Sequence, residues 1–327
     1  MFILGLQGSP RQGGNTDILL SAFLEKAADA GAATEVIQVA RARIAPCKGC
    51  GYCETHGQCV IRDDPMATRI FGLLRKADMV VAASPVYFYG VSAQLKGLID
   101  RCQTLWARKY PFKLRDPLAH IREGVLLCVG ATKGKHLFDG ITLTVRYFFD
   151  AIDAGFGEAL TFRGIEAKGA IRHQPGLDEE MAAIIEKRVR PRLARKQILF
   201  VSPKGACRAP LAAALTARRY GSRLRIAFGA WEPASALSDS MVRMVETEGM
   251  DLGYRRPESI QDALRGGRPD RVVVIGDENQ GQTPVSGVET LYWPVPVADT
   301  VDESEAMRLR QVLSTRVKEL ESWAASS

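Results

Sequence analysis

The chain has 327 residues, of which 46% are hydrophobic and 25% are charged, and its formal net charge is +7 at pH 7. This composition is that of a folded globular protein and excludes a disordered, collagen-like or low-complexity chain. No apolar run of about 18 residues or more occurs, so we expect a soluble, cytoplasmic protein without a membrane anchor or a secretory leader. The length favours two domains, because a single hydrophobic core stops growing at roughly 250 to 300 residues.

The chain opens with a short apolar run, residues 2–6, which predicts a buried parallel strand. A glycine-rich turn follows and leads into a helical pattern over 17–30, an arrangement that places backbone amides where anions bind. Ser9 and Thr16 add hydroxyl groups, and Asn15 is placed to cap the helix. The turn matches neither a Walker loop nor a G-x-G-x-x-G motif, so it predicts a site for a monophosphate such as that of FMN. A plain turn would account for the glycines but not for the hydroxyls.

After a second predicted strand at 36–39, four cysteines occur within thirteen residues, at Cys47, Cys50, Cys53 and Cys59. The spacing C-x2-C-x2-C-x5-C is typical of iron-sulfur proteins, whereas zinc sites usually combine two separated C-x2-C hairpins or include histidines. We therefore expect a [4Fe-4S] cluster. A structural zinc and a reduced, metal-free loop packed against a dimer partner remain alternatives, while disulfides are not expected in the cytosol.

A third predicted strand, 79–83, ends in an aromatic loop. This loop follows the carboxyl end of a parallel strand, where open α/β sheets bind ligands. Its residues Tyr87, Phe88 and Tyr89 are suited to line an isoalloxazine ring or to form a dimer contact. Both roles are compatible with one loop.

Five predicted strands alternate with helices in the first domain, so we expect an α/β fold with a flavodoxin-like parallel sheet in the order 2-1-3-4-5. The remaining predicted elements are helices at 66–77, 92–108, 137–154 and 178–192 and strands at 124–130 and 159–162. A third loop at the same edge of the sheet contains Thr132. Cys102 and Cys128 fall within a helix and a strand pattern and are expected to be packing residues.

Three motifs together resemble the NADPH-dependent FMN reductase superfamily, and within it the iron-sulfur flavoproteins. They are the turn 8–16, the cysteine loop with Asp63 and Asp64, and the segment 84–101, and the resemblance covers roughly residues 1–190. It implies that the FMN phosphate is held by Ser9, Arg11, Asn15 and Thr16. The residues expected at the flavin ring are Pro85, Val86, Tyr87, Phe88, Tyr89 and Gly90, with Thr132 added from the third loop.

The same resemblance bears on the other cofactors and on assembly. It implies that the four cysteines bind a [4Fe-4S] cluster near the flavin of a neighbouring subunit, in a dimer or a tetramer. NAD(P)H or ferredoxin is then the expected electron donor. Relatives that keep similar cysteines without a cluster also occur, so the resemblance supports the flavin more strongly than the metal.

A basic stretch at 187–196 separates the two domains that we expect, residues 1–190 and 197–327. It has no aromatic residue and matches no binding motif, so we expect a solvated helix end and linker and no nucleic-acid site. The second domain begins with a strand at 197–201, a turn, and a helix at 211–220. An arginine at a helix start after a strand favours an oxyanion. The oxyanion-binding candidates in this turn are Ser202, Gly205 and Arg208.

The second domain resembles the low-molecular-weight tyrosine phosphatase and thioredoxin-coupled arsenate reductase family over roughly residues 197–323. We therefore expect a second, smaller α/β domain of this type. Residues 272–277 match a later strand of the family, and Tyr292-Trp293 matches a turn that contains a tryptophan.

The sequence departs from this family at the positions that carry the chemistry. Ser202 stands where the family has its nucleophilic cysteine, Cys207 falls on a position that is not nucleophilic, and the region 275–284 contains no cysteine. The aspartate expected soon after Trp293 is displaced to Asp299. A serine hydroxyl lacks the low pKa that makes a thiolate attack. We expect an inactive domain that binds an oxyanion or serves as a docking or dimerising module.

These features favour an FMN-dependent oxidoreductase that takes electrons from NAD(P)H or ferredoxin. The electrons would reach a small acceptor, such as oxygen, peroxide, a quinone or a metal-bound species, through the flavin and a [4Fe-4S] cluster. One alternative is a redox or oxyanion sensor in which the flavin domain is regulatory. Another is a cluster-free FMN or quinone reductase.

Overall fold

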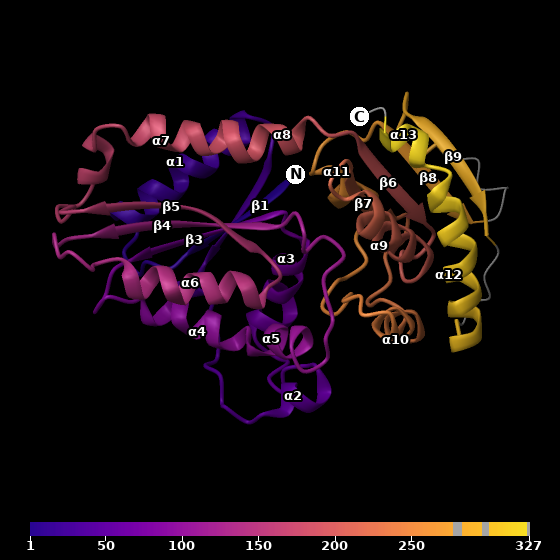
Figure 1. Cartoon of the computed structure of the whole chain (residues 1–327), viewed down its shortest axis with the longest axis horizontal. Helices are drawn as coiled ribbons and strands as arrows, with labels where there is room; N and C mark the ends of the chain where they lie inside the picture. Colours follow the sequence, from indigo (N-terminus) through magenta and orange to yellow (C-terminus); the bar gives the residue numbers. More distant parts are fainter. Residues whose placement is uncertain (277–282, 296–300, 326–327) are drawn as a thin grey trace. The chain divides into compact units, whose positions relative to one another are not determined.

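The computed structural model describes residues 1–276, 283–295 and 301–325, and the chain divides into two compact units (Figure 1). Unit 1 consists of residues 1–113 and 119–191, and unit 2 consists of residues 114–118 and 192–327. The short piece 114–118 lies in the range that the sequence analysis assigned to the first domain. No helix in the described part of the chain has the length and apolar character needed to cross a membrane.

Unit 1 is built on a five-stranded parallel sheet in the order β2-β1-β3-β4-β5, which confirms the predicted flavodoxin-like order. Its strands are β1 (Phe2–Gln7), β2 (Ala33–Gln38), β3 (Met79–Pro85), β4 (Glu123–Gly130) and β5 (Gly155–Arg163). The central strands β1, β3 and β4 are buried along almost their whole length, because helices cover both faces of a parallel sheet.

Two layers of helices cover the sheet of unit 1 (Figure 1). One layer contains α1 (Asn15–Asp29), η3 (Ala170–His173), α7 (Leu177–Ile184), η4 (Ile185–Val189) and α8 (Arg190–Leu193). The other contains η2 (Met66–Ile70), α3 (Phe71–Lys76), α4 (Ala93–Arg101), α5 (Gln103–Lys109) and α6 (Asp139–Ala151). The helix predicted over 92–108 is thus two helices that meet at Cys102.

The segment between β2 and η2 contains the cysteines and little regular structure. It includes η1 (Val39–Arg41) and the short helix α2 (Tyr52–His56), which lies beside α5 (Figure 1). Gly51 and Gly57 flank α2 with φ values of 69° and 65°. These left-handed conformations favour glycine, so the two residues allow the chain to enter and leave a single helical turn sharply.

Unit 2 is built on a four-stranded parallel sheet in the order β7-β6-β8-β9. The strands are β6 (Gln197–Ser202), β7 (Arg225–Ala230), β8 (Arg271–Gly276) and β9 (Glu289–Pro294), and the helices are α9 (Arg208–Tyr220), α10 (Asp239–Thr247), α11 (Ile260–Leu264), α12 (Glu303–Lys318) and α13 (Glu321–Ala325).

The prediction of a turn at Tyr292-Trp293 is wrong, because both residues lie in β9. Trp293 is 3% exposed and packs on Phe200, with ring centroids 5.7 Å apart, whereas Tyr292 on the opposite face is 45% exposed.

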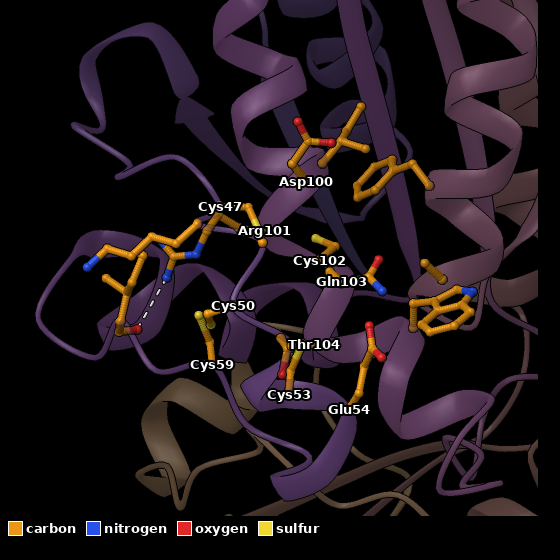
Figure 2. A pocket seen from close by; sticks show the side chains of 18 of the residues that line it. Cys47, Cys50, Cys53, Glu54, Cys59, Asp100, Arg101, Cys102, Gln103 and Thr104 are labelled. Atoms are coloured by element: carbon orange, nitrogen blue, oxygen red, sulfur yellow. Dashed lines mark hydrogen bonds between the residues drawn. The ribbon is translucent and has the colours of Figure 1, made fainter.

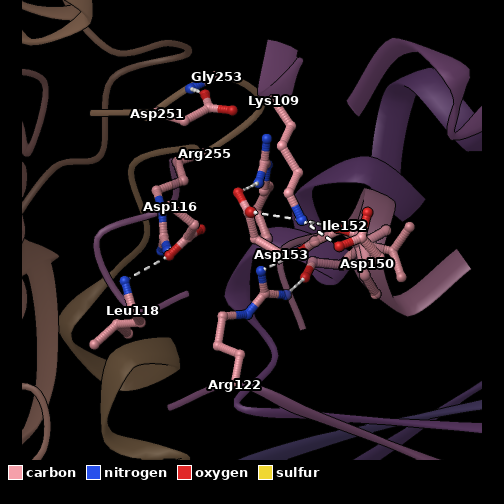
Figure 3. Close-up of polar contacts among 12 residues, drawn as sticks. Lys109, Asp116, Leu118, Arg122, Asp150, Ile152, Asp153, Asp251, Gly253 and Arg255 are labelled. Carbon is pink, nitrogen blue, oxygen red and sulfur yellow. Dashed lines mark hydrogen bonds and ion pairs between the residues drawn. The ribbon is translucent and has the colours of Figure 1, made fainter. Parts of the chain in front are cut away.

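The piece 114–118 is held in unit 2 by backbone and charge (Figure 3). The Arg115 amide donates to the Gly249 carbonyl at 2.9 Å, and the Asp251 amide donates to the Arg115 carbonyl at 2.7 Å. The carboxylate of Asp116 is fully buried and accepts a bond of 2.8 Å from Arg255. These partners are distant in sequence, so no local pattern predicts them.

Figure 3 also shows a buried cation of unit 1, Arg122. Its guanidinium donates to the Ala77 carbonyl at 3.0 Å, to the Ile152 carbonyl at 2.6 Å and to the Leu74 carbonyl. Ala77 and Ile152 are the residues at which α3 and α6 end. Arg122 therefore satisfies carbonyl groups that helix ends leave without an intrahelical donor.

Candidate functional site

The loop between β1 and α1 is organised by its own side chains. The Ser9 amide donates to Gln7 Oε1 at 3.0 Å, the Arg11 amide donates to Ser9 Oγ at 3.2 Å, and the Gly13 amide donates to Asp17 Oδ2 at 2.8 Å. The first amides of α1 have no intrahelical acceptor, as in any helix, so this end of α1 attracts an anion. The loop thus retains the features from which the phosphate site is predicted.

Asn15 has a different role from the predicted helix cap. The N-cap of α1 is Gly14, and no side chain caps the helix. The Asn15 side chain instead donates from Nδ2 to the Ala167 carbonyl at 2.9 Å and accepts at Oδ1 from the Ile171 amide at 3.3 Å. Its amide group therefore fastens the segment after β5 to the start of α1. The sequence gives no signal for this contact, because its partners lie about 150 positions away.

The aromatic loop after β3 forms a tight turn. The Tyr87 amide donates to the Gly90 carbonyl at 3.0 Å, and the Gly90 amide donates to the Tyr87 carbonyl at 2.9 Å. Between them, Phe88 and Tyr89 have φ values of 48° and 60°, which are uncommon for bulky residues. Phe88 is fully exposed and Tyr89 is 53% exposed. Strained conformations of this kind occur at ligand-binding loops, so the turn is suited to present aromatic rings to a flat partner.

The three loops at the carboxyl ends of β1, β3 and β4 are linked to one another. Ser92 Oγ donates to the Gly8 carbonyl at 2.5 Å, which ties the first loop to the start of α4. A Cβ on Gly140 would lie 2.5 Å from the Tyr89 carbonyl oxygen, so α6 begins against the aromatic turn. Thr132 is exposed in the third loop, and its carbonyl accepts from the Gly164 amide at 3.1 Å. The predicted flavin residues therefore lie at one edge of the sheet.

The four cysteines of the motif line one cavity of about 610 Å³ (Figure 2). Cys47 and Cys50 are exposed, and Cys53 and Cys59 are half-buried. The opposite wall comes from α4, α5 and α6, and its side chains were not identified from the sequence. Those that contribute apolar surface are Ile99, Cys102, Trp106, Tyr147, Phe148 and Ala151.

A buried ion pair closes the base of the cysteine loop. Arg101 Nη1 lies 2.5 Å from Asp64 Oδ2, and the side chains of Arg101 and Asp64 are 0% and 9% exposed. Burial disfavours the ionised form of Asp64, but hydrogen bonds from Arg101, Ala67 and Ala45 outweigh it and lower the pKa of this carboxyl below its ordinary value. The same pairing outweighs the burial of Arg101 and raises the pKa of its guanidinium.

The four thiols line one cavity without forming an assembled metal centre. Within the described residues, no three His, Cys, Asp or Glu side chains gather closely enough to hold a metal ion. Thiolates at this spacing are the donors that iron-sulfur clusters and zinc both accept. Burial, followed by the charges of Cys47, Cys59 and Glu54, raises the pKa of Cys53 despite a backbone hydrogen bond that lowers it. Metal binding at this thiol must therefore displace a proton.

The three cysteines outside the motif are buried. Cys102 is 1% exposed and Cys128 is 0% exposed, as expected for packing residues. Burial raises the pKa of both thiols far above the ordinary value. In unit 2, burial raises the pKa of Cys207 to about 12. Each of these three cysteines is therefore protonated at neutral pH and unsuited to nucleophilic attack.

The loop between β6 and α9 contains the three oxyanion candidates of unit 2. The carbonyls of Pro203, Lys204 and Ala206 accept bonds of 2.9 to 3.0 Å from the amides of residues 232, 234 and 238. Gly205 has a φ of 61°, and a Cβ there would lie 2.9 Å from the Ala230 side chain. These three backbone bonds tie the loop to the segment 232–238.

The side chains of Ser202 and Arg208, two of the three oxyanion candidates, already have hydrogen-bond partners. Ser202 is 2% exposed, and its Oγ accepts from the Ala209 amide at 3.4 Å. Arg208 Nη1 donates to the Val295 carbonyl at 3.2 Å. Asp299 and most of the segment 275–284 lie outside the described residues, so the expected loss of an acid and of redox cysteines is a statement about sequence only.

The sequence model of the NADPH-dependent FMN reductase family matches residues 1–133. The N-terminal half resembles this family. An iron-sulfur flavoprotein of Methanocaldococcus jannaschii is 40% identical over 133 residues, which are 41% of this chain and 64% of that protein. An iron-sulfur flavoprotein of Methanosarcina thermophila is 38% identical over 133 residues, or 65% of its length. The chain thus spans less than two thirds of these FMN reductase-like relatives.

Solved structures of two kinds are similar to parts of the chain. An FMN-dependent NADH-azoreductase from Bacillus anthracis, solved with FMN, covers 57% of this chain and 98% of its own, with 11% identity and a TM-score of 0.43. An arsenate reductase from Archaeoglobus fulgidus covers 38% of this chain and 97% of its own, with 20% identity and a TM-score of 0.34. Arsenate reductases are thus among the solved structures that this chain matches.

Proposed function

We propose that the protein is an FMN-dependent oxidoreductase of the iron-sulfur flavoprotein type. The observation that carries this proposal is the match of residues 1–133 to the FMN reductase family, together with four thiols of its cysteine motif on one cavity. NAD(P)H or ferredoxin would supply electrons, and a small molecule would accept them. We further propose that the protein works as a homodimer or tetramer.

The residues of unit 1 would bind and orient the flavin rather than react with substrate. The FMN phosphate would bind at the helix N-terminus, with the Ser9 and Thr16 hydroxyls and the exposed Arg11 guanidinium as side-chain donors. Tyr87, Phe88 and Tyr89 would pack against the ring and exclude water from one side. When bound, FMN supplies hydride and single-electron chemistry.

The four cysteines would hold the [4Fe-4S] cluster, and the wall formed by α4, α5 and α6 would limit its access to solvent. Such a cluster supplies single-electron transfer. Burial and hydrogen bonds to sulfur are the means by which a protein sets the potential of a cluster.

Spectroscopy of protein purified without oxygen tests this proposal. We expect a flavin spectrum with an added broad absorbance, and iron and sulfide in equal amounts. Single serine substitutions of Cys47, Cys50, Cys53 and Cys59 should each remove the broad absorbance and leave the flavin. Cys102→Ser, which changes a thiol in the wall of the same cavity, is the matched control and should keep full iron content. Full iron in any of the four motif variants would reject the four-ligand assignment.

For unit 2 we propose oxyanion or partner binding without turnover. The loop 203–207 leads into the N-terminus of α9, which favours an anion, while Ser202 replaces the nucleophile and Cys207 is held protonated. The full chain should therefore bind phosphate or arsenate without hydrolysing a phosphate ester or reducing arsenate. A measurable turnover would contradict an inactive domain.

A further inference from the structure

Arg101 is a buried cation at the thiol cavity. It is one of the residues that line the cavity of the four cysteines, and its side chain has no exposure to solvent. Its guanidinium also lies within hydrogen-bonding reach of the Cys59 thiol. A buried cation at the wall of a metal-binding cavity has a larger influence on its occupant than a cation in water.

The two terminal nitrogens of Arg101 close the cysteine loop. Nη1 donates to the Ala45 carbonyl at 2.8 Å, and Nη2 donates to the Ile61 carbonyl at 3.2 Å. Figure 2 shows Arg101 together with Cys47, Cys50 and Cys59. Both nitrogens also donate to Asp64, at 2.5 and 3.2 Å. Asp64 in turn accepts from the Ala45 amide at 3.1 Å. Arg101 thus joins the chain two residues before Cys47 to the chain two residues after Cys59.

The third guanidinium nitrogen of Arg101, Nε, makes none of these hydrogen bonds. The Nε–H of Arg101 is buried and has no acceptor among the described residues. A buried donor without an acceptor is destabilising, and native structures keep few of them. Other buried arginines also leave an Nε–H unmatched, but Arg101 is the arginine that lines this cavity. Cys59, a thiol of this cavity that lies within reach of the guanidinium, marks where an acceptor for this donor would lie.

We propose that Arg101 is the positioning residue of the thiol cavity: it clamps both ends of the cysteine loop and offers its remaining N–H to a sulfur-bound, anionic occupant. This inference rests on the proposed function, since a cubane cluster held by four thiolates is such an occupant and carries net negative charge. The contribution of Arg101 is a directed donor rather than net charge, because Asp64 neutralises its cation. Lys96, on the same wall, is paired with Asp100 at 2.6 Å and does not provide this donor.

Two variants and one control separate the two proposed roles of Arg101, which are to close the cysteine loop and to donate its Nε–H to the occupant of the cavity. Arg101→Lys keeps a cation beside Asp64 but lacks the planar fork that reaches both carbonyls and the Nε–H. The double variant Asp64→Asn with Arg101→Gln removes the pair without leaving a buried unpaired charge. Arg122→Lys is the matched control, because Arg122 is an equally buried arginine of unit 1 that donates to carbonyls but does not line the cavity.

The first measurement uses protein without metal. Trypsin should cleave after Lys48, inside the loop, at least about tenfold faster in both Arg101 variants than in the wild type, because loss of a closure contact raises the population of the open loop by such a factor. Arg122→Lys should be cleaved at the wild-type rate. Equal cleavage of the wild type and both Arg101 variants would reject the clamp, whether or not the protein binds iron.

The second measurement uses the full chain after anaerobic reconstitution with iron and sulfide. We expect Arg101→Lys to lose iron to a chelator at least about fivefold faster than the wild type, since removal of an outer contact usually weakens metal binding by more than this. Its ratio of reduced to oxidised cluster at a fixed potential should fall about tenfold, which is about 59 mV for a one-electron couple. FMN content should not change. If Arg101→Lys does not fold, the double variant takes its place in both measurements.

The outcomes are distinguishable. A wild-type protein that binds FMN but no iron would refute the cluster in the proposed function. The trypsin cleavage rates would still test whether Arg101 closes the cysteine loop. A wild type with a full cluster and variants with wild-type potential and iron loss would overturn the donor role of Arg101.

Discussion

The loops of the two units are closed by different means. In unit 1 the ligand loops are closed by side chains: Ser92 holds the Gly8 carbonyl, Asn15 holds the segment after β5, and the Arg101–Asp64 pair holds the cysteine loop. In unit 2 the loop between β6 and α9 is closed by backbone, through three carbonyls that accept amide hydrogen bonds. Side-chain closure depends on the residue type and on charge, whereas backbone closure survives the loss of a side chain. The fold of the second loop therefore depends less on the identity of its side chains.

The largest expected effect follows from removing the charge of Asp64. Asp64→Asn leaves Arg101 buried without its counter-ion, and breaking a buried pair in this way costs about 3 to 5 kcal/mol. We expect this loss in the free energy of unfolding of unit 1 at neutral pH, measured by urea denaturation. An unchanged free energy would show that the cysteine loop is not closed by charge.

The effect of Asp64 has a defined pH dependence. The folded-state pKa of Asp64 is lowered, so its contribution is fully present above the unfolded pKa of about 3.9 and is lost as the pH falls through the lower folded-state value. The difference between wild type and Asp64→Asn should therefore be constant from neutral pH down to about 5 and shrink below about 4. A difference that grew as the pH fell would contradict the assigned direction.

A smaller effect is expected from Ser92→Ala. The Ser92 hydroxyl donates to the buried Gly8 carbonyl and caps α4 by accepting from the Leu95 amide at 3.2 Å. Loss of a cap costs about 1 kcal/mol, and an unsatisfied buried carbonyl adds about 1 to 3 kcal/mol. We expect lower stability of unit 1 and weaker FMN binding, measured by fluorescence titration. Ser238→Ala, which removes a similar cap from α10 in unit 2, should leave FMN binding unchanged.

Anion binding in unit 2 should depend on Arg208. Its charged hydrogen bond to an oxyanion is worth about 1.5 to 3 kcal/mol, so Arg208→Ala should weaken phosphate binding roughly 10- to 150-fold in calorimetry of the full chain. The full chain is used because residues 114–118 belong to unit 2. Equal affinity in both proteins would leave the domain a docking module.

The smallest effect tests backbone closure directly. Lys204 and Glu232 form an exposed ion pair across the loop of unit 2, next to the bond from the Glu232 amide to the Pro203 carbonyl. Glu232→Ala removes the ion pair but keeps the backbone bond, and exposed pairs contribute about 0 to 1 kcal/mol. We expect unfolding and phosphate binding within experimental error of the wild type. A large loss would show that side chains close this loop as well.

Local sequence patterns predicted the parallel sheet of unit 1 and its order, because strand, glycine-rich turn and helix occur in consecutive residues. The spacing of the four cysteines also predicted that they act together, and the structure places all four on one cavity. Contacts between distant residues were not predictable: Asn15 bonds to residues 167 and 171, and Arg101 joins residues 45 and 61. The strands β7 and β9 were missed because most of their residues are only partly buried, so neither has the continuous apolar run of β6 or β8.

The identity of the bound flavin tests the central claim most directly. The full chain, purified and saturated with a mixture of FMN, FAD and riboflavin, is freed of excess ligand and denatured, and the released flavin is identified by chromatography. The loop between β1 and α1 suits one phosphate, so we predict FMN as the released flavin, with riboflavin bound far more weakly. Release of FAD, equal binding of riboflavin, or no flavin after saturation would contradict the account.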